Sequence, residues 1–126
     1  MKRRSEEYLS DAERFLAASR ALLEAGISEN SASEAYRAML LAARAALSEE
    51  GREAKTHRGT WSLFDALFVR TERFDRGLRD AARDGQELRL DSDYRLGGAT
   101  PEEAREMLSA AERFLAAVRE MFAGRA

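Results

Sequence analysis

The sequence predicts an all-α protein, built as one up-and-down helical bundle domain over residues 1–126. Apolar residues recur at steps of three and four in every long segment, the spacing that places side chains on one face of a helix. No segment alternates apolar and polar residues as a half-buried strand does. Glycines and helix-capping residues separate the periodic segments, and the chain has the length of a single domain.

The composition excludes several classes of protein. The absence of cysteine removes disulfides, thiolate nucleophiles and cysteine-ligated metal centres. No apolar run approaches the roughly 20 residues that cross a bilayer, and the charged N-terminus lacks the apolar core of a signal peptide. We therefore expect a soluble cytoplasmic protein without a membrane partner. The net charge of -2 indicates that any RNA site would be a local basic patch.

The most strongly periodic segment predicts a central helix over residues 32–50. Its buried stripe comprises Tyr36, Met39, Leu40, Ala43 and Leu47. Alanines between these positions favour helix and allow neighbouring helices to approach closely. Ser31 and Glu34 have the spacing of a capping box at its start, and Gly51 suits the left-handed residue that follows a helix.

Three more helices are expected before the last one. The first covers residues 5–25 and ends at Gly26, and a short, very hydrophobic third helix covers residues 60–70. The fourth runs over residues 72–90 and contains two glycines, each of which costs about 1 kcal/mol relative to alanine inside a helix. Short links between the first helices favour antiparallel neighbours.

The last helix has the clearest boundary in the sequence. It follows residues 91–99, which contain two consecutive glycines and are expected to form a loop. Thr100 supplies a threonine cap, Pro101 occupies the first helical position, and Glu103 completes a capping box. A wide apolar face then continues towards the C-terminus.

The one histidine of the chain lies in a basic junction after the central helix. His57 follows Arg52 closely, and this pair is the most suggestive of chemistry. Histidine acts as a general acid or base near neutral pH, and arginine neutralises a phosphate without a metal. Lys55 and Arg58 add positive charge, and Trp61 offers a stacking surface for a base. The pair could therefore cleave RNA; alternatively, His57 caps or hydrogen-bonds the following helix while the arginines are solvated.

A second polar group precedes the glycine-rich loop. It comprises Arg89, Asp91, Asp93, Tyr94 and Arg95. Closely spaced carboxylates can bind a divalent cation, but this segment lacks the glycine and distal glutamate of an EF-hand, so we expect no metal site and no cofactor. We favour a structural interpretation, in which Asp93 pairs with an arginine and Tyr94 packs on the bundle.

Arginines recur at nearly every turn of the fourth segment. They are Arg70, Arg73, Arg76, Arg79 and Arg83. Such a row could follow a phosphate backbone. However, Glu72 precedes Arg76 by four residues and Asp75 precedes Arg79 by four, which is the favourable order for ion pairs within a helix. We therefore expect a solvated, salt-bridged face.

Together these segments resemble the HEPN domain family of prokaryotic helical bundles. The resemblance rests on AYRAMLLAARAAL at residues 35–47, KTHRGTWSLF at residues 55–64, Arg89 followed by Asp93 and Tyr94, and TPEEAREMLSAAERFL from Thr100. It covers nearly the whole chain and is strongest to a branch with Lys-Thr-His after the second helix and Asp-Tyr after the fourth. Arg37 departs from the family, whose members often have a second tyrosine there, and Leu40 and Leu41 replace an aromatic-histidine pair.

The resemblance implies a bundle of four long helices plus one shorter helix. It also implies a homodimer that binds a partner nucleotidyltransferase in a toxin–antitoxin-like two-gene module. The residues expected to contact the partner, a nucleotide or RNA are Lys55, Arg58, Arg89, Asp93 and Tyr94. Other branches are metal-independent ribonucleases with an arginine and a histidine at the spacing of Arg52 and His57, but they carry this motif later in the bundle. We therefore expect a binding protein, with a ribonuclease using His57 and Arg52 as the alternative.

Overall fold

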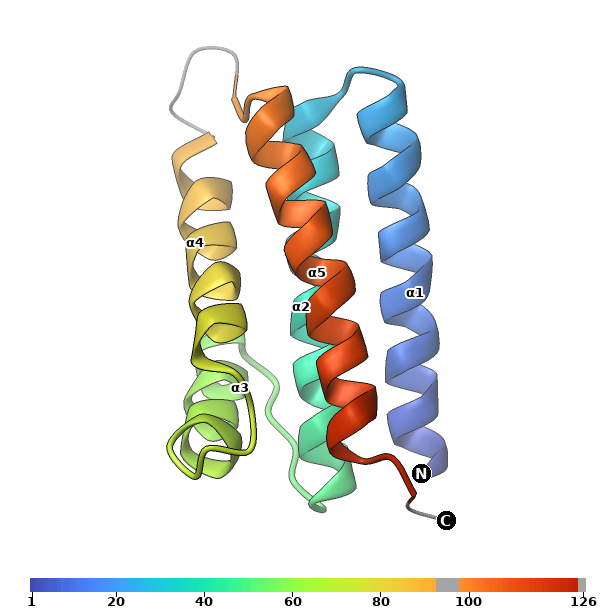
Figure 1. The fold of residues 1–126 in the computed structure, drawn as a ribbon, viewed down its shortest axis with the longest axis vertical. Coiled ribbons are helices and arrows are strands. Elements are labelled where there is room, and N and C mark those ends of the chain that lie inside the picture. Colours follow the sequence, from blue (N-terminus) through green and yellow to red (C-terminus); the bar gives the residue numbers. More distant parts are fainter. Residues whose placement is uncertain (93–97, 125–126) are drawn as a thin grey trace.

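The computed structural model describes residues 1–92 and 98–124, and of residues 89–92 only the backbone. Its helices are α1 (Arg3–Glu24), α2 (Ser28–Glu49), α3 (His57–Phe64), α4 (Arg76–Ser92) and α5 (Pro101–Met121), with a π-helical segment η1 (Asp65–Val69) directly after α3. Figure 1 shows the four long helices α1, α2, α4 and α5 side by side, running alternately up and down. Strands are absent from the part of the chain that is described, and the predicted all-α bundle is confirmed.

The central position predicted for the second helix is confirmed. α2 packs against α1, α3, α4 and α5. The alanines between its larger apolar residues are almost completely buried, including Ala35, Ala38, Ala42 and Ala46. Their small side chains let the neighbouring helices approach α2 closely. α2 therefore contacts all four of the other α-helices.

Three predicted boundaries are also confirmed. Gly26 and Gly51 follow α1 and α2 with positive φ angles of 80° and 70°, a conformation that glycine adopts without a steric penalty. At the start of α5, the Thr100 hydroxyl accepts a hydrogen bond from the Glu103 amide at 3.1 Å. The Glu103 carboxylate accepts one from the Thr100 amide at 2.9 Å, which completes the capping box.

The predicted start of the central helix is wrong by about one turn. α2 begins at Ser28, so Ser31 lies inside the helix and does not cap it. The Ser31 hydroxyl is buried and donates a hydrogen bond to the backbone carbonyl of Ser19 in α1, at 2.8 Å. Because this side chain serves a contact between two helices, it is not available to the backbone amides of its own first turn.

The third helix begins earlier than predicted. Thr56 is its N-cap, and the threonine hydroxyl accepts a hydrogen bond from the Gly59 amide at 2.9 Å. α3 therefore begins at His57 and not near Thr60. The apolar residues of this segment begin near Thr60, whereas the start of the helix is set by the polar Thr56 cap.

The fourth helix begins later than predicted, at Arg76. Glu72 has a positive φ of 61° and lies in the turn before the helix. The Asp75 carboxylate accepts a hydrogen bond from the Leu78 amide at 3.0 Å and marks the true start. Gly77 consequently lies in the first turn of α4, where the cost of glycine in a helix interior does not apply.

Gly85 has a packing role inside α4. A Cβ atom at this position would lie 2.7 Å from Sδ of Met107 in α5 and 3.4 Å from the ring of Tyr36 in α2. Glycine lowers the stability of the helix at this position, as predicted for glycine in a helix interior, but its missing side chain allows α4 to approach α5 and α2 closely.

Aromatic side chains fill the core where α3, η1 and α5 meet. The ring centroid of Phe64 lies 5.1 Å from that of Phe68, 4.9 Å from Phe74 and 5.6 Å from Phe114.

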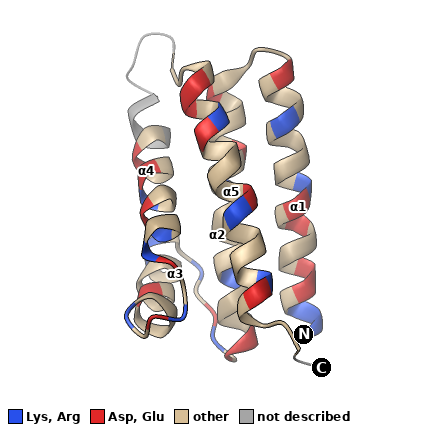
Figure 2. Ribbon diagram, in the orientation of Figure 1, with Lys and Arg blue, Asp and Glu red and all other residues tan. Residues whose placement is uncertain are grey.

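Figure 2 shows that charged residues of both signs lie along the helices. Among the described residues, none of the helices combines the length and the apolar character needed to cross a membrane.

Candidate functional site

His57 is the first residue of α3, at the junction that the sequence predicts. Arg44 of α2 holds this junction in place: its Nε donates to the Thr60 hydroxyl at 3.2 Å and its Nη2 donates to the Lys55 carbonyl at 3.3 Å. The Thr60 hydroxyl in turn donates to the Thr56 carbonyl at 2.7 Å. These bonds fix the first turn of α3 and, with it, the direction of the His57 side chain.

Tyr36 joins His57 to Trp61 inside the bundle. The Tyr36 side chain comes from α2 and is fully buried. Its hydroxyl oxygen lies 3.0 Å from the indole Nε1 of Trp61 and 3.3 Å from Nδ1 of His57. Because an indole N–H can only donate, the tyrosine oxygen accepts that bond and its own hydrogen can be directed at Nδ1.

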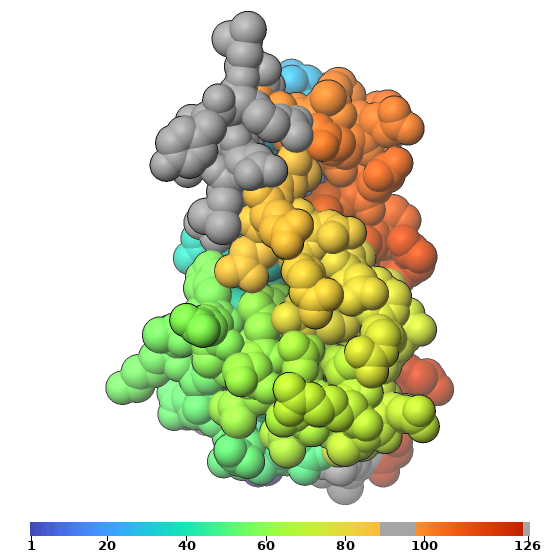
Figure 3. Space-filling model, turned by 90° about the vertical axis from the view of Figure 1, so that its left-hand side faces the viewer, coloured from blue at the N-terminus to red at the C-terminus, as the bar shows by residue number. Residues whose placement is uncertain are grey.

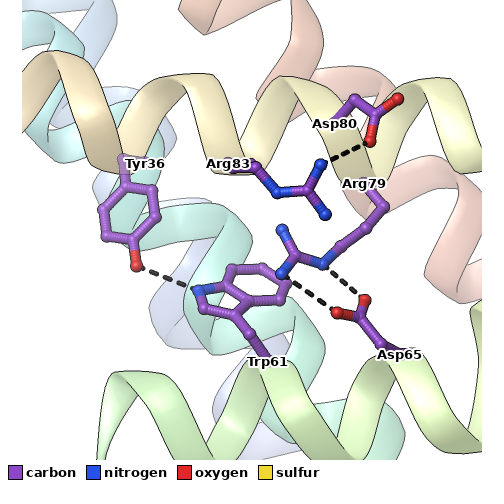
Figure 4. A network of polar contacts seen from close by, with 6 residues as sticks. All are labelled: Tyr36, Trp61, Asp65, Arg79, Asp80 and Arg83. Carbon is purple, nitrogen blue, oxygen red and sulfur yellow. Dashed lines mark hydrogen bonds and ion pairs between the residues drawn. The ribbon is translucent and has the colours of Figure 1, made fainter.

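Trp61 continues the network to Arg79 in α4. The Arg79 guanidinium lies over the indole, with Cζ 4.4 Å from the ring centroid, in a cation–π contact. Its Nε and Nη2 donate to the two carboxylate oxygens of Asp65 at 2.6 Å and 3.2 Å. Figure 4 shows Trp61 bonded to Tyr36 on one side and the Arg79–Asp65 pair on the other. Arg79 is only 6% exposed, so the pair is largely removed from water.

The π-helical segment provides the carboxylate of this network. Asp65 is the first residue of η1, and its carbonyl accepts a hydrogen bond from the Arg70 amide five residues later, at 2.9 Å. Short π-helical turns within α-helices occur frequently at functional sites. Polar contacts therefore run from His57 to Asp65 through Tyr36, Trp61 and Arg79, and they link α2, α3, η1 and α4.

Comparison with known proteins identifies the family. A family model described as HEPN domain matches residues 5–121 of the chain. The chain belongs to the HEPN domain family. It is also similar to a UPF0332 protein of Gloeobacter violaceus, with 30% identity over 122 residues that cover 94% of this chain and 95% of that protein. The family predicted from the sequence motifs is confirmed.

This HEPN domain places Arg52 and His57 in different surroundings. Arg52 is exposed and lines a narrow depression together with Arg4, Tyr8 and Glu53, beside α1. In the same place, Arg4 donates to the Glu53 carboxylate at 2.5 Å. His57 lies next to Tyr36 and is not among the described residues that line this depression. Arg52 therefore lines the depression beside α1, whereas the imidazole of His57 contacts Tyr36 inside the bundle.

The remaining predicted contact residues fall into two groups. Lys55 and Arg58 flank His57 and are exposed. Asp93 and Tyr94, together with the side chain of Arg89, lie outside the described residues. Within the described ranges, no three histidine, aspartate or glutamate side chains come together as ligands for a metal ion.

Sequence reasoning missed the network as a unit. The sequence predicts that Tyr36 lies in the core, that Arg79 lies on a solvated face and that Trp61 offers a stacking surface. That prediction for Trp61 is wrong, because the indole is only 3% exposed and lies under the Arg79 guanidinium. The spacing of Trp61 and Asp65, one helical turn apart, was the available signal for a shared face. No local signal linked either residue to Arg79.

The predicted salt-bridged arginine row is only partly correct. Arg73 pairs with Glu50 at 2.9 Å, and Arg83 pairs with Asp80 at 3.1 Å. Arg79 pairs with Asp65 of η1 and not with Asp75, which caps α4. Arg79 is therefore buried, although it was predicted to be solvated with the rest of the row.

Proposed function

We propose that this HEPN protein is the dimeric binding component of a toxin–antitoxin-like two-gene module and that its partner is a nucleotidyltransferase. One observation supports binding over cleavage: the single histidine is held by a buried tyrosine, whereas Arg52 lies beside α1. Metal-free cleavage of RNA needs the acid–base group and the phosphate-neutralising group at the same scissile bond. The polar surface around His57, with Lys55 and Arg58 exposed beside it, is suited to contact a nucleotide or RNA.

The groove between α4 and α5 is a suitable surface for the partner protein. Its volume is about 400 Å³. Its apolar lining consists of Ala81, Leu88, Met107 and Ala110, and its charged lining consists of Asp84, Glu103, Glu106 and Arg113. Since acidic groups outnumber basic ones and the floor is apolar, we propose that it takes a basic, amphipathic helix of the nucleotidyltransferase.

Co-expression tests the proposed partner. A nucleotidyltransferase encoded next to this gene should co-purify with the tagged HEPN protein. Glu106→Arg should weaken the complex, because it places a positive charge at the groove. Glu120→Arg is the matched control, since Glu120 is an exposed residue of the same helix that does not line the groove. Failure of the wild-type proteins to co-purify would remove the partner from the proposal.

Incubation with RNA in EDTA tests the binding role against the alternative. We expect no cleavage by the purified wild-type protein. Cleavage that His57→Ala abolishes, and that the exposed-site control Ser62→Ala retains, would instead establish a ribonuclease. In that enzyme His57 would be the acid or base and Arg52 the group that stabilises the phosphate.

A further inference from the structure

We propose that a recess between η1 and α4 binds the phosphate group of a ligand. The recess has a volume of about 180 Å³. Its charged lining consists of Asp65, Arg70, Arg76, Arg79, Asp80 and Arg83. None of these side chains lines the α4–α5 groove, so the proposal does not depend on the partner protein.

The charges around the recess do not cancel. Asp65 is already paired with Arg79, and Asp80 is paired with Arg83. Within the described residues, no ion pair engages Arg70 or Arg76, although both side chains line the recess. The two remaining positive charges match a phosphate dianion, and the planar fork of arginine donates to two phosphate oxygens at once.

Arg79 adds a buried donor that has no acceptor among the described residues. Its Nε and Nη2 bind Asp65, whereas Nη1 is buried without a hydrogen-bond partner in the described part of the chain. Figure 4 shows this third nitrogen turned away from the Asp65 carboxylate. Buried polar groups are normally hydrogen-bonded, and a bound ion is one way in which an exception is satisfied. An anion held by Arg70 and Arg76 brings acceptor oxygens to the wall that contains Arg79.

The size of the recess indicates which part of a ligand enters. Sites that enclose a drug-sized molecule have volumes of about 300–1,000 Å³. A recess of about 180 Å³ is smaller, so it holds a phosphate group while the rest of the ligand lies outside. Figure 3 shows the side of the molecule on which η1 and the first turns of α4 reach the surface. The phosphate can belong to a free anion, a nucleotide or an RNA backbone.

A titration of the full-length protein followed by NMR tests this site. Inorganic phosphate replaces chloride at constant ionic strength, and the backbone amides of η1 and early α4 are recorded with the Arg79 Nε–H signal. We expect saturable shifts of these signals. Titrations with AMP and with a short single-stranded RNA then identify the source of the phosphate, because the natural class of ligand should bind more tightly than inorganic phosphate while moving the same signals.

Variants make the test specific to the recess. Arg70→Gln and Arg76→Gln change exposed side chains outside any ion pair of the described residues, and each should weaken phosphate binding about tenfold. Arg105→Gln is the control, because Arg105 is exposed on α5 and does not line the recess. The absence of saturable shifts with all three probes, or an equal loss in Arg105→Gln, would overturn the proposal.

Discussion

Ser19 of α1 and Ser31 of α2 hydrogen-bond to each other's backbone across the helix interface. Each hydroxyl donates to the carbonyl oxygen of the other residue at 2.8 Å, and the two hydroxyl oxygens lie 3.1 Å apart. Both side chains are fully buried. The pair therefore joins α1 and α2 through two reciprocal, buried hydrogen bonds.

Alanine substitutions should reveal this coupling. We expect Ser19→Ala and Ser31→Ala each to lower the free energy of unfolding by about 1 kcal/mol, because each leaves a buried partner less well bonded. The double variant should lose less than the sum of the two. Urea denaturation measures all three, with the exposed Ser109→Ala as the control. Strict additivity would contradict the coupling.

The largely buried ion pair between Asp65 of η1 and Arg79 of α4 should matter far more than the exposed Asp80–Arg83 pair within α4. Asp65→Asn leaves the Arg79 charge buried without its counter-ion and should cost about 3 kcal/mol of stability. Asp80→Asn breaks the pair with Arg83, whose side chains are 52% and 54% exposed, and should cost no more than about 0.5 kcal/mol. Equal losses in denaturant unfolding would show that the first pair is not structurally important.

Removal of the Tyr36 hydroxyl should disturb Trp61 and His57. Tyr36→Phe leaves the Trp61 N–H without this acceptor and should lower the free energy of unfolding by about 1–3 kcal/mol. It should also shift the His57 ring signals in NMR spectra, since the tyrosine oxygen lies 3.3 Å from Nδ1. The half-buried Tyr8, changed to phenylalanine, serves as the control. Unchanged His57 signals would disprove the contact.

The two threonine caps should contribute similar amounts. Thr100→Ala removes the cap of α5, and Thr56→Ala removes the cap of α3, and each should cost about 1 kcal/mol. Thr71 is the matched control, because its exposed hydroxyl donates to the Leu67 carbonyl and accepts no amide bond of a helix start. Thermal unfolding measures the stability of all three variants. A loss in Thr71→Ala as large as the loss in the cap variants would contradict this prediction.

Sequence reasoning identified the fold from signals that are local. The apolar stripe of residues 32–50 and the capping box at Thr100 depend on neighbours within one or two turns, and both predictions agree with the structure. The error at the start of α2 arose because a longer-range contact replaced the expected cap. Ser31 has the right spacing for a cap, but its hydroxyl bonds to α1 instead, and no feature of residues 28–34 reveals that partner.

The candidate site was predictable only in part. His57 at a helix junction follows from the polar stretch after Gly51, and the structure agrees. The contacts of that imidazole could not be predicted. Tyr36 belongs to the apolar stripe of α2, and its position in that stripe predicts only that it is buried in the core. The pairing of Asp65 with Arg79 joins residues of two helices, whereas the sequence offered Asp75 as a nearer partner. Local spacing cannot rank such competing acceptors.

The wide turn of η1 sets the rotational phase of the chain that follows it. The Arg70 amide bonds to the Asp65 carbonyl and the Arg73 amide bonds to the Phe68 carbonyl, five residues back in each case. The hydrogen bonds of η1 span five residues, one more than those of an α-helix. Because each residue turns an α-helix by about 100°, the additional residue determines the direction in which the Phe68 side chain points. The exposed Ala66 should therefore accept many replacements, whereas its deletion would swing Phe68 out of the aromatic core. At this point of the chain, length is constrained more tightly than side-chain identity.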